Sequence, residues 1–194
     1  EPFAWRAYGE HVNRFRQRVG LAAQSAAGYA VARRRMTTLH AVSRHVLPRA
    51  ADWPPGFHVT GYLFLDEPVD PAPDLVRFLG DGPPPVAIGF GSMTGGDPAE
   101  TGRLVLDAVR RAGVRAVLLS GWGGLDMDTP HDDDVVTIEH APHGWLFPRV
   151  AAVVHHGGAG TIAAALRAGV PSVVAPHMAD QPYWGRRIHE LSGG

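Results

Sequence analysis

After Pro85, five short apolar segments alternate with helix-like segments, and this alternation constrains the fold more than any other feature of the chain. The apolar segments are residues 86–90, 116–119, 135–138, 151–154 and 172–175. Between them, residues 104–112 and 162–168 carry apolar side chains at helical spacing. Apolar strands that alternate with helices are typical of a parallel sheet covered on both faces. The sequence therefore predicts an α/β fold with a doubly wound, Rossmann-like parallel sheet.

A glycine-rich segment, His155-His156-Gly157-Gly158-Ala159-Gly160-Thr161, joins the fourth of these strands to the next helix. The first turn of a helix has unpaired N–H donors and carries about half a positive charge, so the junction favours an anion. Thr161 adds a hydroxyl group and His156 a titratable donor. We interpret the segment as a cradle for a diphosphate. His155 should point to the opposite side of the strand, and we expect its role to be structural.

The cradle does not match the two commonest phosphate loops. A Walker loop needs a lysine where Gly160 stands, and the dinucleotide fingerprint has a different glycine spacing and opens the first βα unit of its fold. A structural alternative remains, in which the segment is only a glycine-rich turn with two packed histidines. Ligands of such sheets bind beyond the carboxyl ends of the strands. Five loops with unusual chemistry meet at that edge: residues 91–92, 121–124, 140–143, 155–161 and 177–181.

Composition narrows the possible functions. The 194 residues have a formal net charge of -1, which gives no reason to expect nucleic acid or an anionic membrane as a partner. The chain has no cysteine, so disulfides and thiolate metal sites are excluded, and a cytoplasmic location is expected. The histidines lack the helical spacings of a zinc site, so we expect no bound metal. The sequence has no run of about 18 apolar residues, so no membrane span is predicted.

Residues 1–85 do not show the regular alternation of strands and helices that follows Pro85. Residues 5–19 are predicted to form a helix that stops at Gly20, and residues 37–42 and 58–62 to form short strands. We expect three parts: the end of an N-terminal domain (1–65), a proline-rich linker that contains a short helix (66–85) and a ligand-binding domain (86–194). The chain begins without methionine or a leader, and we expect a piece of a longer protein that is also truncated at its C-terminus.

Several motifs of the second part stand in a specific order. They are residues 89–93, residues 120–124 and a block from His140 to Trp184, which contains Ala141-Pro142-His143, the cradle, Gly169-Val170-Pro171 and Asp180-Gln181-Pro182. Together they resemble the nucleotide-sugar-binding domain of GT-B-fold glycosyltransferases of the UDP-glycosyltransferase superfamily. Among these, the chain is most similar to bacterial and fungal sterol 3-β-glucosyltransferases and to antibiotic glycosyltransferases.

The resemblance implies roles for individual residues. His156 matches the histidine that contacts the diphosphate and stabilises the transition state, and Ser92 lies in the loop that reaches the phosphates. Ala141 matches the position whose backbone pairs with the uracil edge, and His143 the position that reaches the ribose. The remaining matches are Gly158, Ala159, Gly160 and Thr161 at the diphosphate, and Asp180 and Gln181 at the sugar hydroxyls.

Two positions depart from the family pattern. Plant-type members stack the base on a tryptophan where this chain has His140, and Trp122 is the candidate for a substitute platform. They also hold the ribose with a glutamate where this chain has Ala164. These departures leave the choice between UDP and TDP open.

The implied function is inverting transfer of a hexose, with glucose as the expected sugar. The donor is a UDP- or TDP-sugar, and the acceptor is a hydroxyl of a small hydrophobic molecule such as a sterol or a natural-product aglycone. No cofactor and no obligatory metal are expected, and membrane contact is expected only peripherally, through the acceptor. The general base belongs to the N-terminal acceptor-side domain, so this chain is expected to bind donor without turning it over.

Two other functions remain open. The first is a nucleotide-sugar-binding module that acts with a separate partner subunit. The second is an epimerase of UDP-sugars, which needs acid/base carboxylates in its cleft. Asp180 is the obvious candidate for such a carboxylate.

Overall fold

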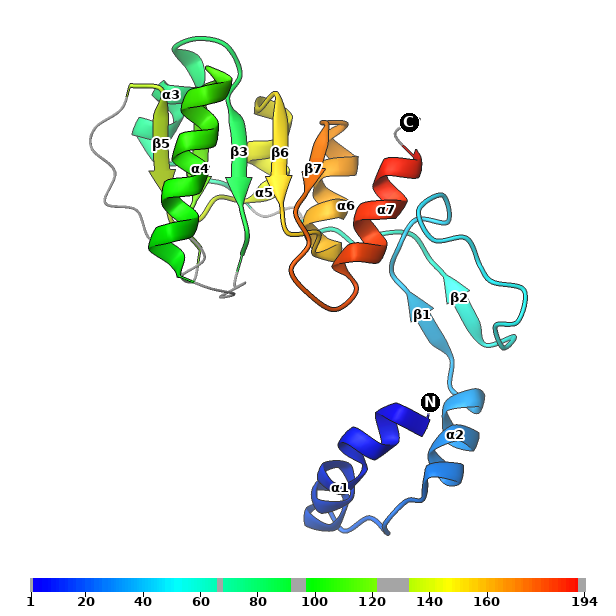
Figure 1. Cartoon of the computed structure of the whole chain (residues 1–194). Helices are drawn as coiled ribbons and strands as arrows, with labels where there is room; N and C mark the ends of the chain where they lie inside the picture. The colour runs from blue at the N-terminus through cyan, green and yellow to red at the C-terminus, as the bar shows by residue number, and fades with distance from the viewer. Residues whose placement is uncertain (1, 66–67, 92–96, 122–132, 192–194) are drawn as a thin grey trace. The chain divides into compact units, whose positions relative to one another are not determined.

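The computed structural model describes residues 2–65, 68–91, 97–121 and 133–191 (Figure 1). The chain forms two compact units, Glu1–Leu63 and Phe64–Gly194. The motifs that resemble a nucleotide-sugar-binding domain all belong to the second unit.

The first unit consists of two helices and a two-stranded parallel sheet. Its elements are α1 (Pro2–Arg18), α2 (Ala26–Arg35), β1 (Thr38–His40) and β2 (Phe57–Val59). The side chain of Asn13 in α1 joins the helices, since it accepts a hydrogen bond from the backbone N–H of Gln24 at 2.8 Å and donates one to the Gln24 carbonyl at 3.0 Å. The first helix and both strands were predicted, although the strands are shorter than expected. The second helix was not predicted.

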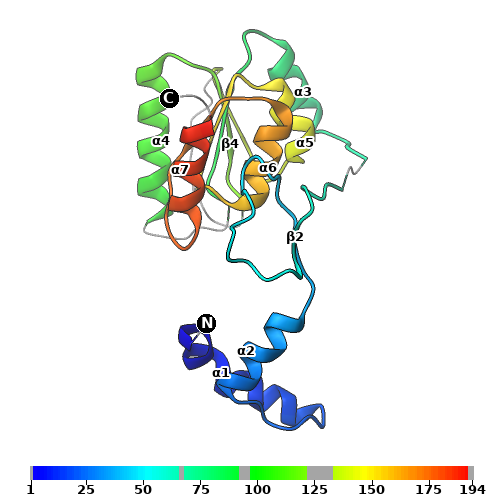
Figure 2. The ribbon, with the colours of Figure 1, turned by 90° about the vertical axis from the view of Figure 1, so that its right-hand side faces the viewer.

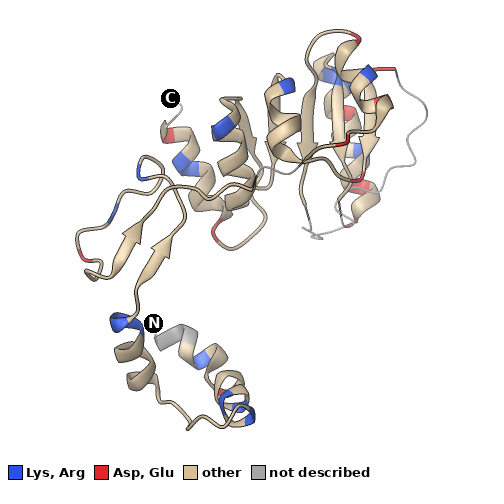
Figure 3. Ribbon diagram, turned by 180° about the vertical axis from the view of Figure 1, so that it is seen from behind, with Lys and Arg blue, Asp and Glu red and all other residues tan. Residues whose placement is uncertain are grey.

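Arginine side chains are concentrated in these two helices. Residues 1–36 contain 7 of the 18 arginines and 2 of the 19 acidic residues, so their formal charge is +5 and that of the remaining residues is -6. Figure 3 shows the blue segments along α1 and at the end of α2. Three arginines, 33–35, occupy the last turn of α2, where positive charge is favourable near the carbonyl end of the helix dipole.

The second unit is built on a five-stranded, entirely parallel sheet. Its strands lie in the order β5-β4-β3-β6-β7, with β3 in the centre. The strands are β3 (Val86–Gly89), β4 (Ala116–Leu119), β5 (Val135–Ile138), β6 (Ala152–His155) and β7 (Ser172–Val174). All five lie where the apolar segments predicted them.

Helices cover both faces of this sheet (Figures 1 and 2). The first face carries α3 (Pro73–Gly80), α5 (His143–Leu146) with the short helix η1 (Phe147–Arg149), and α6 (Ala159–Ala168); the second carries α4 (Pro98–Ala112) and α7 (Gln181–Leu191). Side chains alternate between the faces along each strand, so Ala87 and Val117 pack in the core of the first face and Ile88 and Leu118 in that of the second. The predicted doubly wound α/β fold is confirmed.

Helix α3 lies inside the segment that was expected to be a linker. The short helix itself was predicted, but its packing was not: Leu75 is buried in the core that contains Ala87 and Val117. Part of the proline-rich segment therefore belongs to the α/β unit.

Candidate functional site

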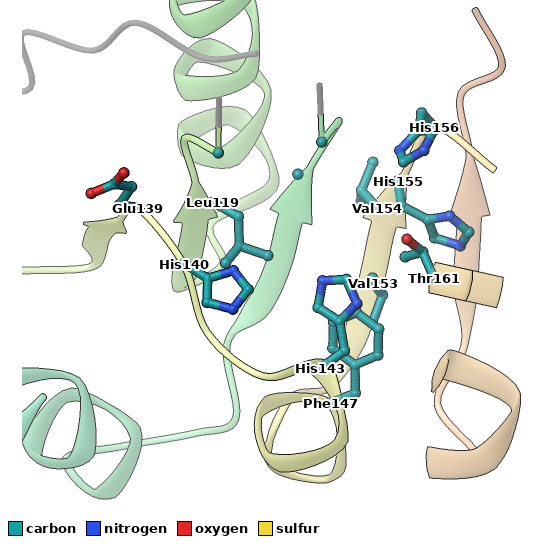
Figure 4. Close-up of a pocket in the computed structure, with 13 residues that line it drawn as sticks. Leu119, Glu139, His140, His143, Phe147, Val153, Val154, His155, His156 and Thr161 are labelled. Carbon is teal, nitrogen blue, oxygen red and sulfur yellow. The ribbon is translucent and has the colours of Figure 1, made fainter. Parts of the chain in front are cut away.

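A cavity of about 420 Å³ lies at the carboxyl ends of β3, β4 and β6 (Figure 4). From β3 the chain proceeds outward to β4 and β5, and then returns to place β6 on the other side of β3. Such a reversal opens a crevice between the loops of neighbouring strands, where α/β proteins bind ligands. The cavity is lined by Gly89, Gly91, Leu119, Gly121, Glu139, His140, His143, Phe147, Val153, Val154, His155, His156 and Thr161.

The turn between β6 and α6 forms one end of the cavity. Gly157 adopts a φ of 91°, and Gly158 is the N-cap of α6 without a side chain that could pair with the first-turn N–H groups. These groups therefore remain donors for a ligand. Ala159, Gly160 and Thr161 form the first turn, and Thr161 also lines the cavity. The structure thus has the strand–turn–helix geometry on which the predicted diphosphate cradle depends.

The imidazole of His156 lies between two glycine backbones. A Cβ atom on Gly158 would come within 2.5 Å of His156 Nε2, and one on Gly91 within 3.2 Å of Cε1. Its Nδ1 is buried and has no hydrogen-bond partner among the described residues. Burial lowers the pKa of His156, and His177 lowers it further. The neutral form of the imidazole is therefore favoured beside the α6 N-terminus.

His155 is almost completely buried, with 1% of its surface exposed. Its Nδ1 accepts a hydrogen bond from the backbone N–H of Gly157 at 3.1 Å. Burial, His156 and His143 together lower the pKa of His155 to about 4. Because Nδ1 is the acceptor, the proton of the neutral ring is on Nε2.

This burial makes folding stability depend on pH. The unfolded chain takes up a proton on His155 below about pH 6.5, whereas the folded chain does so only near pH 4. The contribution of neutral His155 to the free energy of unfolding is fully present above pH 6.5 and is lost as the pH falls toward 4. We expect the wild type to lose about 2 kcal/mol more than His155→Leu between pH 7 and pH 5, as measured by urea unfolding. Equal losses would show that folding does not lower the pKa of His155.

Two further histidines line the cavity from the side of α5. The ring of His143 stacks on Phe147, with centroids 4.5 Å apart and planes at 13°. Burial lowers the pKa of His143, and His140 and His156 lower it further. His140 and His143 also line a second cavity of about 510 Å³, whose other walls are Phe64, Leu65, Val69, Pro142, Gly144, Trp145, Arg149, Ala164 and Arg167. Arginine and imidazole are the only ionisable groups among these described wall residues.

Asp180 and Gln181 do not line either of these two cavities. Gln181 is buried, and its Oε1 accepts hydrogen bonds from the backbone N–H groups of His177 at 2.7 Å and Met178 at 3.0 Å. This side chain stabilises the loop before α7. Asp180 is exposed, and its Oδ2 accepts a hydrogen bond from Trp184 Nε1 at 2.6 Å. Their contact with a sugar stays a prediction.

The remaining predicted residues fall into two groups. Ser92 and Trp122 lie outside the described residues. Ala141 is described and buried, with 4% of its surface exposed, directly before the N-terminus of α5. Gly91 and Gly121, which follow β3 and β4, lie close together, since a Cβ on Gly121 would lie 3.2 Å from the carbonyl oxygen of Gly91.

Glu139 is a wall residue that the sequence analysis missed. It is exposed, follows β5 directly and provides the one carboxylate among the described residues that line the first cavity. Its position at the carboxyl end of a predicted strand was the available signal. Over the described ranges, no group of three or more His, Asp or Glu side chains is arranged to hold a metal ion. Nor does any described helix combine the length and hydropathy that crossing a membrane requires.

Comparison with known proteins agrees with this geometry. The family of erythromycin biosynthesis protein CIII-like C-terminal domains matches residues 125–194. A sterol 3-beta-glucosyltransferase from Arabidopsis thaliana is 42% identical over 154 residues, which are 78% of this chain and 24% of that protein. One from Leptosphaeria maculans is 38% identical over 204 residues, covering 98% of this chain and 14% of that protein.

Solved structures show the same architecture. A glycotransferase of kitacinnamycin superposes with a TM-score of 0.66 at 23% identity, over 96% of this chain and 48% of that one. The glycosyltransferase SnogD from Streptomyces nogalater gives a TM-score of 0.52 at 27% identity, over 73% of this chain and 38% of that one. The chain thus carries a C-terminal domain of the UDP-glycosyltransferase type with GT-B architecture. It spans about a quarter or less of the curated relatives that it matches.

Proposed function

We propose that this chain supplies the donor side of an inverting glycosyltransferase. The enzyme transfers a hexose from a UDP- or TDP-sugar to the hydroxyl of a small hydrophobic acceptor such as a sterol, and glucose is the expected hexose. The similarity to sterol 3-beta-glucosyltransferases supports the reaction class. The observation that carries the proposal is the cavity in which His156 and the uncapped N-terminus of α6 lie side by side.

This arrangement suits a departing nucleoside diphosphate. The diphosphate gains about one negative charge when the glycosidic bond breaks, so donors aimed at it stabilise the transition state more than the ground state. The first-turn N–H groups of α6 and the helix dipole provide fixed positive potential. An anion beside His156 offsets the burial that lowers its pKa, so the imidazole becomes protonated as charge develops. These groups supply the stabilisation without a metal ion in the proposed reaction.

The nucleoside extends from the first cavity toward the second. His140 and His143 line both cavities and therefore connect them. The stacked His143–Phe147 pair offers a flat edge beside the ribose and the base. We assign the general base and most of the acceptor pocket to parts of the intact enzyme outside this chain, so the chain is proposed to bind donor and not to transfer it.

Calorimetric titration with UDP, TDP and their glucose conjugates tests the proposal. We expect dissociation constants between about 1 µM and 1 mM, the usual range for substrates. Uridine serves as the matched control ligand because it lacks the diphosphate, and it should bind at least about ten-fold more weakly. If all four nucleotides fail to bind, or uridine binds as well as UDP, the diphosphate is not recognised and the proposal is wrong.

Asp180 is predicted to contact the sugar and not the nucleotide. Asp180→Ala should weaken binding of UDP-glucose about five-fold and leave binding of UDP nearly unchanged, because a hydrogen bond to a charged group contributes about 1 kcal/mol or more. Trp184→Phe is the control, since it removes the indole donor that Asp180 now binds and keeps the carboxylate. Equal losses for both ligands in Asp180→Ala would move Asp180 away from the sugar.

A further inference from the structure

The backbone turn that presents the diphosphate cradle is held by a side chain to which no ligand role has been given. His155 ends β6, and its Nδ1 accepts the Gly157 N–H at 3.1 Å across only two residues. Gly157 is the residue with a φ of 91°, and it separates His156 from the N-cap of α6. The hydrogen bond therefore fixes the point at which the chain turns from the strand into the cradle.

The imidazole of His155 also carries a buried N–H donor that has no described partner. Its Nε2, which carries the proton of the neutral ring, has no hydrogen-bond partner among the described residues. A buried, unpaired N–H group costs about 1–3 kcal/mol. An apolar side chain of similar size would fill this position without that cost. Packing alone therefore does not account for histidine here, whereas an acceptor for the Gly157 N–H does.

Protonation of His155 would remove this acceptor, because both ring nitrogens of an imidazolium are donors. Burial holds the ring neutral, and no described group around it favours a positive charge. On the neighbouring strands, its register partners are Gly89 of β3 and Val174 of β7, neither of which titrates. The ionisable groups that interact with it are His156 in the turn and His143 on α5, and a proton on either would oppose one on His155.

We propose that His155 is a positioning residue, whose neutral Nδ1 holds the Gly157 amide and thereby places His156 and the α6 N-terminus against the diphosphate of the donor. This inference rests on the proposed function. It differs from the simple structural role expected from the sequence, because it requires an acceptor atom at this position and not merely a buried ring.

Two variants distinguish the role of His155 Nδ1 as an acceptor from the role of its ring in packing. In His155→Asn, the carboxamide Oδ1 can stand close to where Nδ1 stood and accept the Gly157 N–H, but the smaller side chain leaves a void and lowers stability. In His155→Leu the apolar side chain fills the space and the unpaired Nε2–H disappears, but the acceptor is lost and the buried Gly157 N–H becomes unpaired instead. Each variant, as the full 194-residue chain, is titrated calorimetrically with UDP-glucose at pH 7, and its melting temperature is recorded.

We expect affinity and stability to change independently. His155→Leu should melt near the wild-type temperature, because one buried unpaired donor replaces another, and bind UDP-glucose about ten-fold more weakly, whereas His155→Asn should melt lower and bind within about three-fold of the wild type. If affinity follows melting temperature in both variants, His155 is a packing residue and the inference is wrong. Nitrogen-15 NMR of the wild-type imidazole gives an independent test, since a proton on Nδ1 would contradict the assignment.

These results separate the inference from the proposed function. Should the wild type fail to bind any nucleotide, the proposed function is wrong, and the NMR tautomer still decides whether Nδ1 holds Gly157. Should the wild type bind and His155→Leu bind equally well, the proposed function stands and only the positioning role is lost.

Discussion

His156→Ala is expected to lower the turnover number of an intact enzyme that carries this domain about 100-fold, with a smaller change in KM. One donor that acts on charge developing in the transition state is worth about that factor. The structure places the His156 ring between Gly91 and Gly158, directly beside the N-terminus of α6. Its contact strengthens as the diphosphate leaves, so the loss falls on turnover rather than on binding. Steady-state kinetics with UDP-glucose measures both constants.

A neighbouring imidazole provides the matched control. His177 is exposed, is not a wall residue of the first cavity and lowers the pKa of His156. His177→Ala should therefore retain turnover and shift the ionisation of His156 to higher pH, which appears as a displaced limb in the pH–rate profile. An unchanged turnover number in His156→Ala, or equal losses in both variants, would remove His156 from transition-state stabilisation.

The sheet and the strand–turn–helix geometry of residues 152–168 could be predicted because their signals are local. Each strand of the second unit is a short apolar run, and every such run formed a strand in the parallel sheet. The cradle was identified from glycines between a strand and a helix, which is a pattern of neighbouring residues. The convergence of the loops followed from the rule that parallel strands end at one edge.

The packing around the site could not be predicted, because it depends on distant contacts. The burial of His155, which is the main cause of its depressed pKa, depends on the packing of the completed fold around β6. The side chain of Gln181 matches a sugar-binding position in sequence, yet in the fold its Oε1 accepts the N–H groups of its own loop. Leu75 stands in a proline-rich segment, and only the completed sheet shows that it is core.

Gly157 combines a left-handed backbone conformation with close neighbours on two other elements. It is buried and has a φ of 91°, a conformation that a side chain makes costly. A Cβ atom there would lie 2.8 Å from Cγ1 of Val174 and 3.3 Å from the carbonyl oxygen of Gln181. The first neighbour belongs to β7 and the second to the start of α7, so the clash cannot be relieved by moving one exposed side chain.

Gly157→Ala is therefore expected to destabilise the fold by about 2–5 kcal/mol, the sum of backbone strain and overpacking. The displaced turn should also abolish detectable UDP-glucose binding. Gly113→Ala is the matched control, because Gly113 has a φ of 62° at the end of α4 but no atom within 4 Å of its Cβ position. Gly113→Ala therefore tests backbone strain alone. It should lower the free energy of unfolding by about 1 kcal/mol and leave UDP-glucose binding unchanged. Urea unfolding and calorimetry compare the two. If Gly157→Ala is no less stable than Gly113→Ala, the turn has room that this structure does not show.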